Sequence, residues 1–443
     1  MQETDSQITQ KMEQAGLSQA AIRAFLHGVD GLRRHVKMVV GEEEIRPAEQ
    51  LPVWEDLVSS TPAADAELLS RTAVIKLNGG LGTSMGLQQA KSLLEIKPGI
   101  TFLDLIVRQV QALREQAGCS VQLLLMNSFS TSEDTMAYLR KYADFSSPEQ
   151  VEMLQNKVPK LEQSTLLPIS WPEQPELEWC PPGHGDIYAA LAGSGWLDKL
   201  LAGGIKYAFV SNSDNLGAQP DVHFLRWFAE SGAPFVMEVT PRTEADKKGG
   251  HLAVRRSDGQ LILREVAQCP AEDVPHFQDI SRHRYFNTNN LWIRLDALRD
   301  FMEANGGVVP LPTICNAKSV NPRDAATPAV YQLETAMGAA IQCFPGAQAV
   351  SVPRSRFFPV KTCSDLLLLR SDAVEIDAAG RMLLAPECEG KPPIISLDSK
   401  LYKLVDSLDA LGVPSLKRVK RLTVSIPHHF EPGEPLQGEV VIS

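Results

Sequence analysis

Short apolar runs alternate with longer stretches of helical spacing from Arg71 onward. Two apolar runs cover residues 72–77 and 121–127, and two helical stretches cover about 102–116 and 134–142. This alternation is typical of an α/β fold in which helices lie on both faces of a mostly parallel, Rossmann-like sheet. Three further apolar runs are candidate strands of the same sheet, at 207–211, 235–240 and 291–295.

The two ends of the chain differ from this pattern. Apolar residues such as Ile22 and Phe25 recur at helical spacing, which predicts a helical N-terminal flank over residues 1–70. Short apolar pieces separated by Pro and Gly predict a small β-rich C-terminal domain over residues 372–443. These pieces are also compatible with rungs of a β-solenoid whose repeat is too degenerate to recognise. The main α/β domain then covers residues 71–371.

Composition excludes several classes of protein. The 443 residues include 43 Lys plus Arg against 54 Asp plus Glu, and a net charge of −11 argues against a protein that binds nucleic acid or anionic membranes. The seven cysteines form no CxxC pair, so neither a disulfide framework nor a structural zinc site is expected. The N-terminus is too polar for a signal peptide, and no run of about 18 apolar residues exists to span a membrane. We therefore expect a cytoplasmic protein.

A glycine-rich segment follows the first apolar run. Residues 77–86 read Leu-Asn-Gly-Gly-Leu-Gly-Thr-Ser-Met-Gly, and Lys91 comes shortly afterwards. Glycines at the end of a strand let backbone N–H groups approach a phosphate or the edge of a base. The segment is not a Walker A loop, because Leu87 follows the last glycine, and it is not a dinucleotide fingerprint, because Met85 occupies the third glycine position. It is a candidate nucleotide loop, and the alternative is a tight turn without a ligand.

Two later segments also carry candidate chemistry. In Pro182-Gly183-His184-Gly185-Asp186, Asp186 is expected to cap the following helix, while the glycines free the backbone to lie against a flat ligand that His184 faces. Asp214 follows the apolar run at 207–211. A carboxylate at the carboxyl end of a parallel strand faces the ligand crevice of an α/β sheet and suits Mg²⁺. A structural turn or a helix cap is the alternative in both segments.

The last two segments supply amides and cations. Asn287, Asn289 and Asn290 precede a strand, and their carboxamides offer the donors and acceptors that sugar hydroxyls need, although an Asn-rich turn explains them equally well. Lys361 lies in a local cationic cluster of this acidic protein and is a candidate to neutralise phosphate charge. A solvated basic edge is the alternative.

Together these segments, in this order, resemble the eukaryotic-type UDP-glucose pyrophosphorylase family over about residues 70–372. The resemblance implies a nucleotidyltransferase fold with a C-terminal left-handed β-helix, which makes residues 71–371 the catalytic domain. It also implies UTP and glucose 1-phosphate as substrates and Mg²⁺ as cofactor. A homo-oligomer is a further expectation, although the tail from about residue 372 is shorter and more proline-rich than a full β-helix.

The resemblance implies roles for individual residues. Three residues would be catalytic, namely Lys91, Lys361 and Asp214, and Asp214 would also bind the metal. Seven would contact the nucleotide, namely Leu77, Asn78, Gly79, Gly80, Gln155, Gly183 and Asn212. Three would contact the sugar, namely His184, Asn287 and Asn289. The sequence departs from the family between Leu87 and Ala90, where only the second of two usual lysines, Lys91, is present.

The implied reaction needs no covalent enzyme intermediate. A phosphate oxygen of glucose 1-phosphate attacks the α-phosphorus of UTP, and catalysis consists of alignment and charge neutralisation by Mg²⁺, Lys91 and Lys361. Two alternatives remain at this point. The sugar could be an N-acetylhexosamine or galactose, against which the Asn287–Asn290 segment favours glucose. The protein could also be a non-catalytic binder of nucleotide sugars, but binding alone would not require both lysines and Asp214 together.

Overall fold

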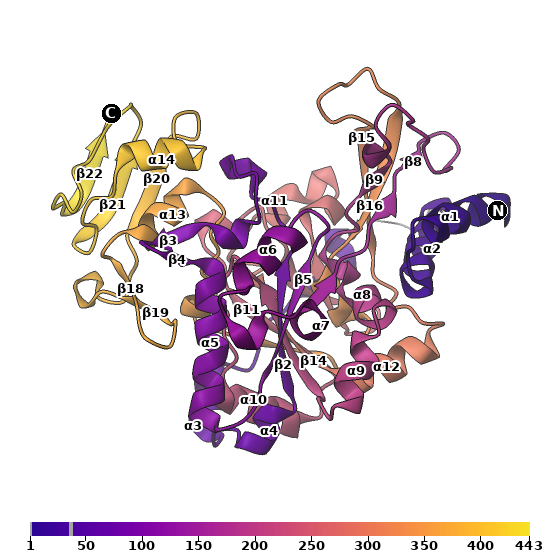
Figure 1. Ribbon diagram of the computed structural model, residues 1–443, viewed down its shortest axis with the longest axis horizontal. Coiled ribbons are helices and arrows are strands. Elements are labelled where there is room, and N and C mark those ends of the chain that lie inside the picture. Colours follow the sequence, from indigo (N-terminus) through magenta and orange to yellow (C-terminus); the bar gives the residue numbers. More distant parts are fainter. Residues whose placement is uncertain (1, 35–38) are drawn as a thin grey trace. The chain divides into compact units, whose positions relative to one another are not determined.

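The computed structural model describes residues 2–34 and 39–443. Its largest sheet has ten strands, in which β1 (Ile45–Pro47), β12 (His251–Arg255), β14 (Tyr285–Arg294), β10 (Tyr207–Asn212), β2 (Thr72–Asn78), β5 (Gln122–Asn127) and β6 (Glu152–Leu154) follow one another (Figure 1). The expected α/β class with a large central sheet is confirmed. None of the described helices is long and apolar enough to cross a membrane.

The chain forms two compact units. The first unit comprises Met1–Ile75, Met153–Val210 and Asp221–Pro353, and the second comprises Lys76–Glu152, Ser211–Pro220 and Arg354–Ser443. This grouping by compactness differs from the three consecutive segments expected from the sequence, and that division stays a prediction.

In the first unit, β14 runs antiparallel to two strands, β10 and β11 (Phe235–Pro241). β11 in turn pairs in parallel with β17 (Gln348–Ser351), and β12 pairs antiparallel with β13 (Leu261–Arg264) and β1. The apolar runs expected at 207–211 and 235–240 lie in strands, and the run at 291–295 lies in β14 up to Arg294, after which Leu295 begins α12 (Leu295–Ala304). Most of their apolar side chains are buried, Trp292 completely, whereas Tyr207 is partly buried. The antiparallel placement of β14 makes the sheet mixed.

The first unit also contains helices and short strands outside this part of the sheet. Its helices are α1 (Gln2–Gln14), α2 (Gln19–Arg33), α3 (Trp54–Ser60), α4 (Ala66–Ser70), α8 (Ile187–Gly193), α9 (Trp196–Ala202), α10 (Val222–Ser231), α11 (Val274–Phe277) and α12 (Leu295–Ala304). Its short strands are β7 (Val158–Pro159), β8 (Leu161–Glu162), β9 (Trp179–Cys180), β15 (Thr313–Ser319) and β16 (Ala329–Thr335).

The N-terminal flank is helical over α1 and α2. The apolar face predicted from the sequence is buried, with Ile22 and Phe25 packed in one cluster with Leu161 and Leu333. Ser18 begins α2, and its hydroxyl accepts a hydrogen bond from the backbone N–H of Ala21. The flank thus packs against β8 and β16 in the same unit.

In the second unit, the predicted helix at 102–116 is α5 (Phe102–Ala117), and the one at 134–142 is α6 (Ser132–Leu139). α5 begins with a capping box formed by Thr101 and Asp104. The other elements of this unit are α7 (Pro148–Val151), α13 (Cys363–Arg370), α14 (Val405–Leu411), β3 (Glu95–Lys97), β4 (Ile100–Thr101), β18 (Val374–Ile376), β19 (Met382–Leu384), β20 (Ile394–Leu397), β21 (Val419–Val424) and β22 (Gly438–Ile442).

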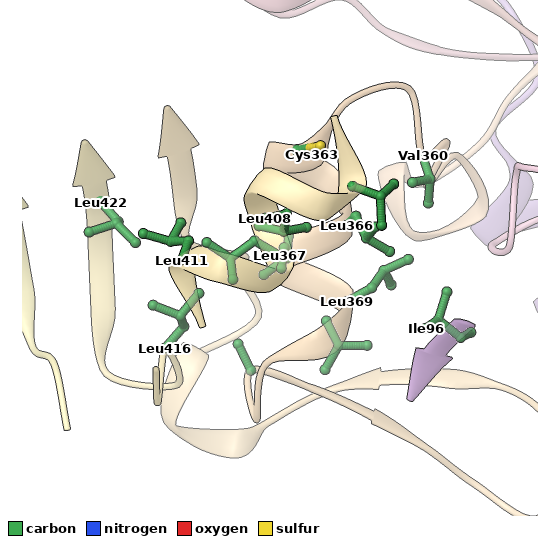
Figure 2. Packing of buried hydrophobic residues seen from close by; sticks show 14 of the residues in the cluster. Ile96, Val360, Cys363, Leu366, Leu367, Leu369, Leu408, Leu411, Leu416 and Leu422 are labelled. Carbon is green, nitrogen blue, oxygen red and sulfur yellow. The ribbon is translucent and has the colours of Figure 1, made fainter. Parts of the chain in front are cut away.

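The C-terminal part of the second unit is β-rich, as expected. β20, β21 and β22 form a three-stranded parallel sheet, an arrangement that successive rungs of a β-helix also have. Figure 2 shows leucines of α13, such as Leu366 and Leu367, packed beside Leu408 and Leu411 of α14 and Leu422 of β21. Because α13 shares this core with the residues after 372, the chain does not divide into two compact units near residue 372.

Candidate functional site

A carboxylate shared by two lysines lies in the second unit. Lys91 Nζ and Lys361 Nζ each donate a hydrogen bond to Oδ2 of Asp214, both over 2.8 Å. Lys91 Nζ also donates to the backbone carbonyl of Val360, the residue before Lys361. The structure therefore brings together the three residues expected to be catalytic, although 123 and 147 positions separate the two lysines from Asp214 in the chain.

A buried lysine of β2, Lys76, holds the loop that carries Asp214. Lys76 Nζ donates to Ser211 Oγ over 2.8 Å and to the carbonyl of Ala218 over 2.7 Å, so it joins the two ends of the loop. The backbone N–H of Ser213 donates to the carbonyl of Leu77 over 3.0 Å. The predicted nucleotide contact Leu77 is thereby linked to the Asp214 loop.

The two lysines stabilise the ionised form of the Asp214 carboxylate. Burial would by itself raise the pKa of Asp214, but the charges and hydrogen bonds of Lys361 and Lys91 hold this pKa below its usual range. The side chains of Asp214 and Lys91 are each 13% exposed, whereas that of Lys361 is 56% exposed. Lys361 is therefore the more accessible of the two cations.

Asp214 also has an oxygen that suits a metal. Its Oδ1 is buried and has no hydrogen-bond partner among the described residues. A hard carboxylate oxygen of this kind fits Mg²⁺, which usually takes one or two carboxylates and completes its shell with water and substrate phosphates. No group of three or more His, Cys, Asp or Glu residues suited to a metal occurs within residues 2–34 and 39–443, so a cage built wholly of protein ligands is not part of this site.

The glycine-rich segment forms an open loop beside these residues. Gly82 and Gly86 adopt left-handed backbone angles, with φ of 64° and 84°, which side chains rarely tolerate. Gly80 has open space where a Cβ would lie, and its carbonyl accepts a hydrogen bond from the backbone N–H of Lys91 over 3.0 Å. The glycine-rich segment and Lys91 are thus joined directly.

Three predicted nucleotide contacts take part in hydrogen bonds within the fold. The side chain of Asn78 is buried, and its Nδ2 donates to Asn127 Oδ1 over 2.7 Å and to Thr135 Oγ1 over 3.0 Å. The carbonyl of Gly79 accepts a hydrogen bond from Ser128 Oγ over 3.0 Å. Asn212, at the end of β10, accepts the backbone N–H of Asn215 on its carbonyl. Asn78 therefore supports the loop through its side chain and does not offer that side chain to a ligand.

The first unit holds the Gly183 turn. Gly183 has φ of +79°, and a Cβ there would lie 2.4 Å from the carbonyl oxygen of Thr335. The backbone N–H of Thr335 donates to the carbonyl of Pro182 over 2.9 Å. Gln155 Nε2 donates to the carbonyl of Gly183 over 2.9 Å, so the two residues expected at the base do lie together.

His184 and Asp186 continue this turn. His184 Nδ1 accepts a hydrogen bond from the backbone N–H of Met337 over 3.0 Å, which places the proton of the neutral ring on Nε2. Asp186 occupies the position before α8, but its side chain makes no capping hydrogen bond, contrary to the sequence-based expectation. The carboxylate instead accepts hydrogen bonds from Asn156, and burial raises its pKa to about 6.

Two of the three predicted sugar contacts, Asn287 and Asn289, lie in β14 of the first unit. Asn287 Nδ2 donates to Asn289 Oδ1 over 2.8 Å, and the backbone N–H of Asn289 donates to Asn287 Oδ1 over 2.9 Å. Asn289 has φ of 59°, a left-handed conformation that Asn adopts more readily than most other side-chain-bearing residues. Glu238 Oε1 and Oε2 accept hydrogen bonds from Trp292 and Asn290, which fixes the strand behind this pair.

Sequence analysis missed the residues that support the site. Lys76, Asn156 and Glu238 are polar, and each bonds to a loop or strand that carries a predicted site residue. Lys76 had a visible signal, because a lysine within the apolar run at 72–77 must find buried partners. Asn156 had no such signal, because its partner depends on tertiary structure.

Comparison with known proteins gives consistent matches. A family model described as UTP--glucose-1-phosphate uridylyltransferase matches residues 27–436. The protein of that name from Saccharomyces cerevisiae is 43% identical over 393 residues, which are 87% of this chain and 76% of the yeast protein. The Solanum tuberosum protein of the same name is 40% identical over 91% of this chain and 82% of its own length.

Solved structures agree with these matches. The UDP-glucose pyrophosphorylase of Leishmania major, known in open and closed structures, has a TM-score of 0.92 and 46% identity, covering 99% of this chain and 94% of that chain. A mutant of that protein in complex with UDP-glucose has a TM-score of 0.93 and 46% identity, covering 100% and 95% of the two chains. The corresponding structure from Trypanosoma brucei has a TM-score of 0.88 and 43% identity, with 100% of both chains covered.

Proposed function

The chain belongs to the UTP--glucose-1-phosphate uridylyltransferase family, and we propose that the residues described above carry out this family's reaction in the roles set out here. The protein is a nucleotidyltransferase that forms UDP-glucose and pyrophosphate from UTP and glucose 1-phosphate. The relatives named above act on glucose by name, which favours glucose over an N-acetylhexosamine or galactose.

The reaction moves a uridylyl group between two anions. A phosphate oxygen of glucose 1-phosphate forms a bond to the α-phosphorus of UTP, the bond from that phosphorus to the bridging oxygen of the β-phosphate breaks, and pyrophosphate leaves. Lys91 and Lys361 offset the negative charge of the phosphates as this happens. Lys361 has the freedom to follow the transferring phosphate because its side chain is more than half exposed.

Asp214 would hold Mg²⁺ through Oδ1, and the bound ion would supply further charge neutralisation at the phosphates. Asp214 also fixes the ammonium groups of both lysines on its other oxygen, Oδ2. A single carboxylate would therefore position two cations of the protein and one metal ion. This sharing of Asp214 is the observation that carries the assignment of the catalytic residues.

Residues of the first unit are assigned to the base and the sugar. Gln155 and Gly183 would contact uracil, and His184, Asn287 and Asn289 would contact the glucose phosphate. In the second unit, the backbone from Leu77 to Gly80 and Asn212 would line the nucleotide. The support for these roles is the hydrogen bonding of Gln155 to Gly183 and of Asn287 to Asn289.

A turnover assay tests the proposal. Pyrophosphate release is measured with UTP and glucose 1-phosphate in the presence of Mg²⁺, and again after chelation, with ATP and with N-acetylglucosamine 1-phosphate as alternative substrates. We expect turnover with UTP and glucose 1-phosphate that chelation abolishes. Tight binding of UDP-glucose without turnover would instead establish a non-catalytic binder.

We also propose that the protein works in the reducing cytoplasm. All seven cysteines are free thiols, and burial raises the pKa of Cys180 and of Cys343 to about 12, so these two thiols stay protonated and unreactive. A homo-oligomer stays a prediction, which light scattering of the purified protein would test.

A further inference from the structure

Among the described residues, Asn156 is the one that holds the carboxylate of Asp186. Its Oδ2 accepts the backbone N–H of Asn156 over 2.7 Å, and Nδ2 of Asn156 lies 3.0 Å from Oδ1 and 3.1 Å from Oδ2. Throughout the described part of the chain, no cation pairs with this buried carboxylate. Asn156 directly follows Gln155, and Asp186 ends the turn that begins at Gly183, so this contact joins the two segments assigned to the base.

A very short strand pair brings these segments together. β7 and β9 are antiparallel, with Val158 opposite Cys180 and Pro159 opposite Trp179. The backbone N–H of Lys160 donates to the carbonyl of Glu178 over 2.8 Å, which extends this ladder on the side away from Gln155. On the Gln155 side, the segments are joined by hydrogen bonds from Gln155 to the Gly183 carbonyl and from Asn156 to the Asp186 carboxylate. Without the second contact, the position of Gln155 would depend on this short ladder and on its own hydrogen bond to Gly183.

The opposite side of the turn is fixed in a different way. Backbone N–H groups of Thr335 and Met337 bond to Pro182 and His184, and a Cβ on Gly185 would lie 2.4 Å from the hydroxyl oxygen of Thr335. The turn therefore has little freedom against β16. The position of residues 155–156, in contrast, depends on hydrogen bonds that involve side chains.

The chemistry of the contact points to a role beyond stability. A buried carboxylate without a cation lowers the stability of the fold, and burial raises the pKa of Asp186 to about 6, so the carboxylate is mainly ionised at neutral pH despite this cost. An apolar residue would fill the same space without that cost. What the carboxylate adds is a bidentate contact that fixes both the backbone and the side chain of Asn156.

We propose that Asp186 and Asn156 are positioning residues for recognition of the base, which hold Gln155 against Gly183 so that its amide has a fixed orientation. This inference rests on the proposed function, which assigns Gln155 and Gly183 to uracil. Because Nε2 of Gln155 donates to the carbonyl of Gly183, its Oε1 remains as an acceptor. Uracil presents a donor at N3 and cytosine presents an acceptor there, so a fixed Oε1 selects uracil.

Steady-state kinetics with UTP and CTP test this inference. In Asp186→Ala we expect the KM for UTP to rise about tenfold and the preference for UTP over CTP in kcat/KM to fall by a similar factor, while kcat and the KM for glucose 1-phosphate change less than about twofold. Asn156→Ala keeps the backbone donor and should raise the KM for UTP by about threefold. In Asp186→Asn, Asn156 can turn its amide to restore both hydrogen bonds, so the UTP kinetics should stay close to wild type.

Ser194→Ala is the matched control, because Ser194 bonds to the carbonyl of Ala190 at the opposite end of α8 and touches neither segment. If Asp186→Ala lowers kcat and raises both KM values to the same extent as this control, the positioning role is wrong. If Asp186→Ala does not fold, Asn156→Ala decides, and an unchanged KM for UTP in that variant overturns the inference.

Gln155→Leu separates the positioning role from the proposed function. An unchanged preference for UTP in Gln155→Leu overturns the assignment of Gln155 itself. If the preference is lost in Gln155→Leu but kept in Asp186→Ala and Asn156→Ala, only the positioning role is overturned.

Discussion

Lys91 donates a hydrogen bond to the same oxygen of Asp214 that accepts one from Lys361, so that Oδ1 of this carboxylate is left without a partner among the described residues. An oxygen buried in this way costs free energy unless something binds it. The arrangement gives Asp214 two separable tasks, which are to hold the lysines on one oxygen and to bind a metal ion on the other. The first prediction separates these tasks.

Asp214→Asn keeps an oxygen for the lysines but removes the charge that Mg²⁺ needs. We expect turnover to fall by about 10²-fold or more, and the Mg²⁺ concentration for half-maximal rate to rise, because a carboxamide is a much weaker ligand for a hard cation. The measurement is an Mg²⁺ titration of the initial rate for both proteins, with melting curves to establish folding. An Asn variant as active as wild type at saturating Mg²⁺ would show that the metal is held elsewhere.

Lys361→Ala should lower kcat far more than it raises the KM for glucose 1-phosphate. The charge of Lys361 matters most where negative charge develops during transfer, so its loss should cost about 10²-fold in kcat. The side chain is more than half exposed, so the fold should be unaffected. Lys420→Ala, an exposed lysine on β21, is the control and should leave kcat unchanged. Near-normal turnover of Lys361→Ala would place this lysine among the solvated surface cations.

The three residues proposed to be catalytic could be singled out from the sequence, whereas most of the residues that support them could not. Lys91, Asp214 and Lys361 stand in short segments of unusual composition beside strands, so chemistry and position both pointed to them. The contact between Asn156 and Asp186 depends on β7 and β9, which are two residues long and have no periodicity to detect. Asp186 looked like a helix cap because residue type and position both fitted, and a buried tertiary partner took its side chain instead.

The strands and helices were predictable for a similar reason. Apolar runs such as 121–127 are buried and appear as strands, and the helix at 102–116 has an apolar face and a capping box. Two features could not be predicted, namely the antiparallel direction of β14 and the core that α13 shares with the C-terminal residues. Both depend on which elements meet in space. Local pattern specifies an element, and packing decides its partner.

A pH-dependent prediction concerns Asp104 at the start of α5. Burial would raise its pKa, but hydrogen bonds from Lys141, Thr101, Tyr142 and Tyr138 lower the pKa from 3.8 to about 2. The ionised carboxylate therefore stabilises the folded protein at pH values above about 4, and this stabilisation is lost as the pH falls to about 2.

Asp104→Asn should therefore lower the free energy of unfolding at pH 7 by on the order of 2 kcal/mol, with a smaller difference from wild type near pH 3. Urea unfolding at both pH values measures this difference. Asp144→Asn is the control, because the Asp144 side chain is 67% exposed and lies 3.8 Å from Arg114, and exposed pairs contribute little. Equal effects of the two substitutions at pH 7 would contradict the prediction.

The last prediction compares two glycines of the first unit that share a positive φ but differ in ψ. Gly183 has φ of 79° and ψ of 172°, a region that is essentially restricted to glycine, whereas Gly195 has φ of 78° and ψ of 1°, in the left-handed region where alanine costs about 1 kcal/mol. Their surroundings differ, because a Cβ on Gly183 would lie 2.4 Å from the backbone oxygen of Thr335, whereas a Cβ on Gly195 meets nothing within 4 Å.

Gly183→Ala therefore adds two costs that Gly195→Ala lacks, which are the close approach of the turn to β16 and a backbone conformation that alanine does not tolerate. Because the contacting atom at Gly183 is backbone and cannot rotate away, the turn must shift, and Gln155 loses its partner there. We expect Gly195→Ala to cost about 1 kcal/mol in urea unfolding and to leave the kinetics unchanged. Gly183→Ala should cost at least about 2 kcal/mol more and raise the KM for UTP about tenfold or more. Equal stabilities and equal KM values in the two variants would show that the turn moves freely and that its contact with Thr335 has no part in binding the base.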